Sequence, residues 1–169
     1  LEYHLPENVA AYAIRTNFGY KDFNLNAEYA QKFNDPTTLN NMIYKNGNAF
    51  LITASYAMKG LGIYLSGIRS DNMDFRTRRT ALSNNNIINY IPNISKEHTY
   101  ALSSMYPYAS QNLGQIGFQA QINYQIPKKT KIGGKYGTDI ALNYSRMHGI
   151  KQQLVEDAIA SGDVAGTDG

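Results

Sequence analysis

The sequence contains no cysteine and no tryptophan, and its 169 residues include only three histidines. Without cysteine the chain forms no disulfide and has no thiolate for a metal ion. It also lacks any run that approaches the roughly 18 consecutive apolar residues of a membrane-spanning helix. Neither sign of charge forms a long block. The net charge of +3 comes from scattered lysine and arginine, which gives no indication of a nucleic acid partner.

What the sequence does contain is a long alternation of apolar and polar residues at 115–126. These residues read Gln-Ile-Gly-Phe-Gln-Ala-Gln-Ile-Asn-Tyr-Gln-Ile. Because side chains of a strand point alternately to its two faces, this segment has one apolar face and one uncharged, hydrogen-bonding face. Strands of soluble proteins usually have about 5–6 residues, whereas a tilted strand that crosses a membrane needs about 9–11. The segment therefore predicts a membrane-spanning strand of an outer-membrane β-barrel.

Eight strands are predicted in all. They span 8–17, 21–32, 48–58, 61–76, 86–92, 98–106, 115–126 and 138–147. The predicted fold class is all-β: an antiparallel up-and-down transmembrane β-barrel, or a meander segment of one, over residues 1–148. Short and long connections alternate, as turns and loops do in bacterial barrels, except that 127–137 is long where a short one is expected. Helical spacing at 150–160 predicts that 149–169 form an extracellular-type loop with a short helix, truncated in this chain.

The two parities of the predicted strands define two sets of candidate residues. The first set is polar and is predicted to face the lumen of the barrel. It comprises Asn24, Asn26, Glu28, Gln115, Gln119, Gln121, Asn123, Gln125, Asp139 and Asn143. The second set is apolar and is predicted to face lipid; it comprises Leu25, Phe50, Ile52, Ile116, Phe118, Ile122 and Leu142. A soluble antiparallel sheet with one wet face gives the same alternation and is the alternative explanation.

Four arginines lie at the end of the fourth predicted strand and in the loop that follows it: Arg69, Arg76, Arg78 and Arg79. A planar guanidinium group binds phosphate through paired hydrogen bonds. The cluster therefore predicts a contact with the phosphates of lipopolysaccharide, if this end of the barrel faces outward. A solvated charged loop explains the same cluster without any ligand.

Catalytic and metal-binding patterns are absent from the sequence. His4, His98 and His148 are isolated, and none has the paired spacing of a metal site. Ser103 and Ser104 follow His98, but a nucleophile needs an oriented base and a third partner, and nothing in the sequence identifies them. We therefore predict no catalytic residue, no metal, no cofactor and no enzyme activity.

Four stretches resemble a family of Bacteroidota outer-membrane proteins of unknown function. They are 67–76, 98–102, 106–109 and 133–138, and the similarity runs from about residue 20 to residue 147. The resemblance implies a β-barrel in the outer membrane of a Gram-negative bacterium. It brings no catalytic or binding residues. It also implies that the chain is a fragment of a longer barrel, which agrees with a start that lacks a leader and an end in loop composition.

The predicted function is that of a non-enzymatic outer-membrane barrel with a porin-like transport role or a structural or assembly role in the envelope. Its predicted partners are outer-membrane lipid, lipopolysaccharide and other envelope proteins, together with a small solute that the sequence does not identify. The alternative is a soluble all-β module that binds a sugar or a lipid. The two hypotheses differ at Ile116, Phe118, Leu142 and Tyr144, which lipid-facing strands expose and a soluble sandwich buries.

Overall fold

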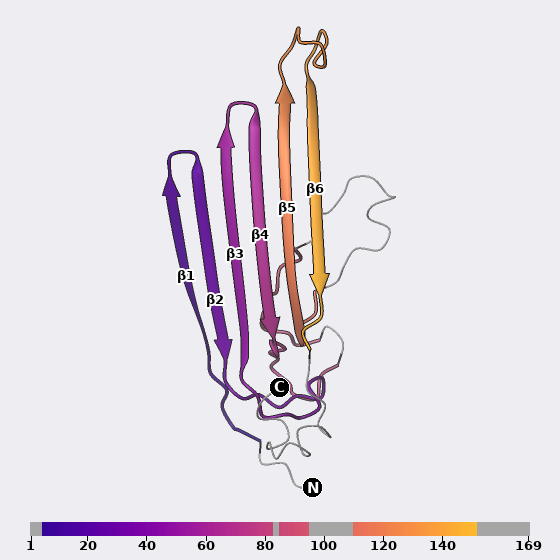
Figure 1. Cartoon of the computed structure of the whole chain (residues 1–169). Helices are drawn as coiled ribbons and strands as arrows, with labels where there is room; N and C mark the ends of the chain where they lie inside the picture. Colours follow the sequence, from indigo (N-terminus) through magenta and orange to yellow (C-terminus); the bar gives the residue numbers. More distant parts are fainter. Residues whose placement is uncertain (1–4, 83–84, 95–109, 152–169) are drawn as a thin grey trace.

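The computed structural model describes residues 5–82, 85–94 and 110–151 (Figure 1). Six antiparallel strands pair with one another in the order of the sequence and form one open sheet. They are β1 (Ala11–Tyr20), β2 (Phe23–Lys32), β3 (Gly47–Met58), β4 (Leu61–Asp71), β5 (Gly114–Ile126) and β6 (Thr138–His148). Among the described residues, no helix is long and apolar enough to cross a membrane. The fold is an all-β meander, as the alternation in the sequence predicts.

The described strands number six rather than eight, and two predictions account for the difference. The predicted strand at 86–92 is wrong, because only Ile87 pairs there, in an isolated bridge with Arg76. This stretch is apolar on both parities and ends in Pro92, which has no N–H to donate to a ladder. The predicted strand at 98–106 lies outside the described residues. The fourth strand ends at Asp71 rather than at residue 76, as the chain turns away from the sheet.

Because β4 pairs directly with β5, the connections fall into two groups at opposite ends of the sheet. Residues 21–22, 59–60 and 127–137 connect strands at the end that we call the turn end (Figure 1). Residues 33–46 and 72–113 connect strands at the opposite end, which we call the loop end. The connection at 127–137 thus takes a regular place among the turns. It lies at the end where the sequence predicts a turn, and it is longer than the other two turns.

The first turn lies later than the sequence predicts, since the predicted strands at 8–17 and 21–32 leave their connection at 18–20. β1 continues to Tyr20, and the chain reverses at Lys21 and Asp22, with a positive φ of 51° at Lys21. Tyr20 then pairs with Phe23. Because paired residues share a face, this register keeps the aromatic side chains of β1 and β2 together, which a turn at Asn17 would not do.

The register divides the strand residues between two faces with few exceptions. Most of the large apolar side chains lie on one side, which we call the apolar face. It carries Tyr12, Ile14, Phe18, Tyr20, Phe23, Leu25, Tyr29, Phe50, Ile52, Tyr56, Met58, Leu61, Ile63, Leu65, Ile116, Phe118, Ile122, Tyr124, Ile140, Leu142 and Tyr144. The opposite side, which we call the polar face, carries the amide-rich rows.

The buried hydrophobic side chains of the described residues are few and lie together. They are Ile68, Met73 and Ile94, which are 4%, 6% and 4% exposed. Ile68 belongs to the polar face of β4, and the other two come from the long connection between β4 and β5. The small core therefore sits on the polar face at the loop end, and no described segment covers the apolar face.

Successive hairpins are staggered at the turn end (Figure 1). The β1–β2 turn directly follows a row of paired residues, and β3 extends two residues beyond that row, to Met58. β5 extends four residues beyond it, to Ile126. The row consists of Tyr20, Phe23, Tyr56, Ile63, Ile122 and Leu142. The sheet is thus sheared by about one residue per strand, which is the kind of stagger that strands of a barrel need.

We predict that Gly60→Ala destabilises the β3–β4 hairpin while Gly62→Ala does not. Gly60 has a φ of +80°, a conformation that costs an L-residue roughly 1–2 kcal/mol. Gly62 lies two residues further on in β4, and a Cβ there would make only ordinary contacts with Asn123. Denaturant titration of the intact protein measures both free energies of unfolding. Equal effects of the two substitutions would contradict this account of the turn.

Candidate functional site

All ten residues predicted to face a lumen lie on the polar face. Toward the turn end this face is open, and Asn24, Asn123 and Gln125 are exposed. Amide groups there also form hydrogen bonds: Gln121 Nε2 donates to Asn123 Oδ1 over 3.1 Å along β5, and Asn26 Nδ2 donates to Thr53 Oγ1 over 3.3 Å between β2 and β3. Toward the loop end the same face is covered, and Gln115 and Gln119 are only 0% and 7% exposed. The polar face therefore has an uncovered half and a covered half.

All seven residues predicted to face lipid lie on the apolar face. Phe118 and Ile122 remain 45% and 42% exposed, and Leu142 is exposed as well. Leu25 is half-buried. The apolar face is therefore a broad surface of exposed hydrophobic side chains. Its strand residues carry charge only near the loop end, at Arg69, Asp71 and Arg146.

The covered half lies beneath part of the β4–β5 connection. We call residues 72–94 the covering segment; the structure describes 72–82 and 85–94 of it. This segment folds back on itself as a small hairpin, in which the Thr77 N–H donates to Asn86 O over 3.0 Å and the Ile88 N–H donates to Phe75 O over 2.9 Å. The side chain of Asn89 donates to Met73 O over 2.6 Å and closes the base of the hairpin. These bonds satisfy much of the backbone of a segment that lies outside the sheet.

Hydrophobic contact attaches the covering segment to the wall of the sheet. Ile68 of the wall is buried together with Met73, and Ile94 lies against β5 at Gly117, where a Cβ would come within 3.1 Å of its Cγ2 atom. Burying an aliphatic side chain of this size contributes roughly 1.5–3 kcal/mol. A cavity of about 480 Å³ remains between the segment and the wall. It is lined by Arg15, Glu28, Ala30, Ala49, Phe50, Leu51, Ile68, Met73, Asn89, Tyr90, Ile91 and Pro92.

Buried charges hold the base of the covering segment. Arg76 Nε lies 2.8 Å from Asp74 Oδ1 and 2.9 Å from Asp74 Oδ2, and both side chains are almost completely buried. Arg76 also donates from Nη1 to Asn85 O over 2.9 Å, across the small hairpin. Lys32, the last residue of β2, is fully buried and donates from Nζ to Asp74 O. A buried ion needs such partners, because an unpaired charge away from water is strongly unfavourable.

Residues of the connection at 33–46 also contact the buried charges at the base of the covering segment. Asp35 lies 3.3 Å from Arg79 Nε and 3.8 Å from Lys32 Nζ. Thr37 Oγ1 donates to Asp74 Oδ2 over 3.4 Å, and Asn40 Nδ2 donates to Asn72 Oδ1 over 3.1 Å. Both loop-end connections thus share one buried polar cluster.

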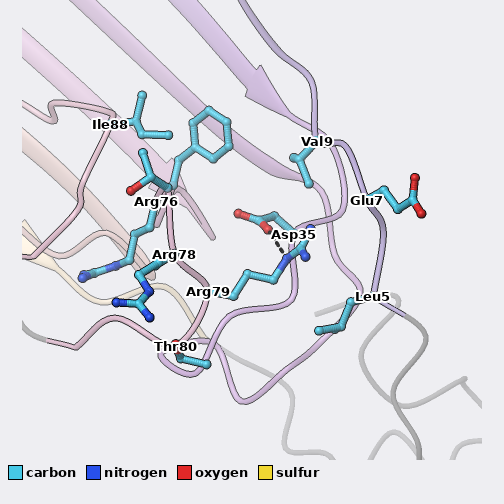
Figure 2. A pocket seen from close by; sticks show the side chains of 11 residues that line it. Leu5, Glu7, Val9, Asp35, Arg76, Arg78, Arg79, Thr80 and Ile88 are labelled. Carbon is cyan, nitrogen blue, oxygen red and sulfur yellow. Dashed lines mark hydrogen bonds and ion pairs between the residues drawn. The ribbon is translucent and has the colours of Figure 1, made fainter.

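The four arginines of the sequence analysis do not form one group. Arg76, Arg78 and Arg79 line a single cavity of about 490 Å³ beside Asp35 and Glu7 (Figure 2). Arg69 lies instead on the apolar face of β4, where it donates to Asn48 Oδ1 over 2.6 Å and lies 3.7 Å from Asp71 Oδ2.

Carboxylates already occupy most of these guanidinium groups. Arg76 pairs with Asp74, whereas Arg79 pairs with Asp35 and donates to Pro6 O. The side chain of Arg78 has no hydrogen bond or ion pair with another described residue and is exposed. Of the four arginines, Arg78 thus has the guanidinium group most available to an anion, and contact with lipopolysaccharide stays a prediction.

No cluster of three or more His, Cys, Asp or Glu side chains that could hold a metal ion lies within 5–82, 85–94 and 110–151. His148 ends β6 on the apolar face, away from the buried carboxylates. Ser103, Ser104 and His98 lie outside the described residues.

Sequence analysis did not identify the covering segment or its buried cluster. It assigned 86–92 to a strand and treated Arg76 and Arg79 as candidates for an external ligand. One signal was available: Asp71, Asp74 and Arg76 bring both signs of charge together within six residues, which is typical of paired rather than ligand-binding charges. The partners Lys32 and Asp35 are about 40 residues away in the sequence and carried no such signal.

The fold and the site together define an all-β meander with one exposed apolar face and one polar face. The covering segment lies over the half of the polar face nearest the loop end. The chain belongs to DUF6029, a family of unknown function that matches residues 1–165. No curated protein and no solved structure is significantly similar to it.

We predict that Asp74→Ala is far more destabilising than Glu28→Ala. Removing Asp74 leaves Arg76 buried without its carboxylate, and breaking a buried ion pair from one side costs about 3–5 kcal/mol. Glu28 pairs with Arg15 over 2.9 Å at the edge of the cavity, where the two side chains are 33% and 72% exposed; solvent screens the pair, and we expect little change there. Denaturant titration of the two variants of the intact protein measures the difference. A small effect of Asp74→Ala would show that the cluster does not hold the loop end.

Proposed function

We propose that this chain is part of an outer-membrane β-barrel whose apolar face contacts lipid acyl chains and whose polar face lines the interior. The protein is non-enzymatic and serves porin-like transport or a structural or assembly role in the envelope. Its location is the outer membrane of a Gram-negative bacterium, of the Bacteroidota as the sequence resemblance implies. Its partners are lipid, lipopolysaccharide near Arg78, and other envelope proteins.

The exposed apolar face is the observation that carries this proposal. Exposed hydrophobic patches larger than a few hundred Å² on soluble proteins mark surfaces that bind another protein or a membrane. Here most strands of a six-stranded sheet contribute several exposed apolar side chains to one side. A soluble binding module would bury Ile116, Phe118, Leu142 and Tyr144, but all four are exposed. Lipid hydrocarbon makes the exposure of such an apolar face favourable, so that no second layer of protein is needed to cover it.

The shear of the sheet supports the same proposal. If all three turns lie at one level, a stagger of one residue per strand has a simple geometric consequence. With about 3.3 Å per residue along a strand and about 4.8 Å between strands, the strands tilt by roughly 35°. This value lies in the range of roughly 35–45° of transmembrane barrels.

The apolar band also has the thickness of a membrane. On β3 it extends from Phe50 to Met58, and Arg69 bounds it on β4. Nine residues tilted by roughly 35° span about 22 Å along the membrane normal, close to the roughly 25 Å apolar band of outer-membrane barrels.

Tyrosines lie near both ends of this band. At the loop end, the hydroxyls of Tyr12 and Tyr29 donate to Gln31 Oε1 over 2.7 and 3.1 Å. At the turn end, Tyr20 is the last residue of β1 and Tyr124 lies two residues before the end of β5. Tyrosine favours a membrane interface because its ring is apolar while its hydroxyl bonds to polar groups.

The outer edges of β1 and β6 pair with no strand among the described residues. An open edge in hydrocarbon leaves backbone groups unpaired, each at a cost of several kcal/mol. The proposal therefore requires that further strands of the intact protein close the sheet into a barrel.

We predict that a tryptophan at position 122 contacts lipid and that one at position 121 does not. The two residues are neighbours in β5 on opposite faces, and this chain contains no tryptophan that would obscure the signal. In vesicles that contain brominated lipids, which quench tryptophan on contact, the fluorescence of Ile122→Trp falls strongly and that of Gln121→Trp changes little. Equal quenching would argue against a lipid-facing apolar side. Recovery of the intact protein from the soluble fraction without detergent would refute the membrane location.

A further inference from the structure

We propose that the covering segment is a fixed constriction that narrows the interior of the barrel at its loop end. This inference rests on the proposed function, since an interior exists only if the sheet closes. It concerns a separate question, namely whether the passage through that interior is open. Barrels of this kind include open channels and barrels that an internal loop or domain plugs.

The position of the covering segment on the polar face is the first argument. Ile68 points to the same side as the amide rows, and Met73, Ile91 and Pro92 share the lining of one cavity with it. Ile94 lies beside Gly117 on that side of β5, where a Cβ would collide with Met147 and would come within 3.1 Å of Ile94 Cγ2. In a closed barrel this side is the interior, so the segment occupies space that would otherwise be lumen.

The strength of the attachment is the second argument. The three buried hydrophobic side chains of the described residues all lie at the contact between the covering segment and the wall. Its base is tied to Lys32 and, through Arg79 and Asp35, to the connection at 33–46. Gly47 adds a steric constraint, because a Cβ there would collide with the backbone carbonyl of Asn72. A loop held by so many buried contacts opens rarely, because the free energy of local opening is high where many apolar contacts are buried.

The uncovered half of the polar face gives the third argument. Between the covering segment and the turn end, the wall carries amides such as Asn26, Asn123 and Asn143, all exposed. The interior is therefore wide and hydrated at the turn end and restricted at the loop end. The restriction, rather than the amide rows, sets how large a solute passes.

Single-channel recording on the intact protein in planar bilayers tests this inference through Ile68→Asn. This substitution replaces a buried aliphatic side chain with an amide, like the amides of the neighbouring strands on the polar face. It removes the hydrophobic anchor of the covering segment, and it places no new group in lipid because Ile68 lies on the polar face. We expect its conductance to rise severalfold over the unmodified protein. Tyr64→Asn is the matched control, because Tyr64 lies on the same face of β4 but is exposed beyond the segment. Its conductance should stay unchanged.

Cysteine accessibility gives a second measurement that does not depend on conductance. Ala49 and Ala57 lie on the same face of β3, and only Ala49 lines the cavity beneath the covering segment. A bulky maleimide should modify Ala57→Cys quickly and Ala49→Cys slowly. Adding Ile68→Asn should accelerate the modification of Ala49→Cys severalfold.

The outcomes separate the two proposals. If the protein is embedded in the membrane and migrates as a heat-modifiable barrel, but Ile68→Asn changes neither conductance nor labelling, the constriction is overturned and the barrel stands. If the protein is not embedded in the membrane at all, the proposed function fails and the constriction with it. Increased conductance of Ile68→Asn alone, together with slow labelling of Ala49→Cys, supports the constriction.

Discussion

Because backbone hydrogen bonds pair β1 through β6 without a break in register, every second residue of all six strands points to the same side. A slip of one residue between any two strands would mix the apolar and polar rows. The register therefore decides which side chains meet lipid in the proposed barrel and which meet its interior. It also sets the shear, and through the shear the tilt of the strands.

This constraint leaves little for an ordinary hydrophobic core. The apolar rows remain exposed, so the opposite side of the sheet is stabilised by other means. At the loop end, a few aliphatic side chains and a cluster of buried ion pairs around Asp74 take that role. Ion pairs of this kind favour one arrangement of the loops over others, because any displacement would leave a buried charge without a partner. We therefore interpret these ion pairs as fixing the position of the loops rather than as raising the free energy of unfolding.

Much of the sheet follows from the sequence, because strand alternation is a local property. The segment at 115–126 predicted β5 to within one residue, and the parity of Phe118 and Gln119 placed them correctly on opposite faces. Predictions failed where a contact distant in sequence overrides local preference. Residues 86–92 have the composition of a strand, but the isolated bridge to Arg76 and the contacts of the covering segment hold them elsewhere. The predicted connection at 18–20 was wrong because the pairing of Phe18 with Leu25 and of Tyr20 with Phe23 favours a longer β1.

The sequence by itself determined that the chain forms long antiparallel strands with one apolar and one amide-rich side, since the period of two is written residue by residue. Only the tertiary structure decided that residues 72–82 and 85–94 cover the loop-end half of the polar side and that Arg76 and Arg79 bind carboxylates of the same chain. Lys32, which donates to the Asp74 carbonyl, and Asp35, which pairs with Arg79, come close to these residues only after β2, β3 and β4 have paired. The physical reason is that backbone pairing follows a local pattern, whereas a buried charge takes its partner from whatever segment the completed sheet brings beside it.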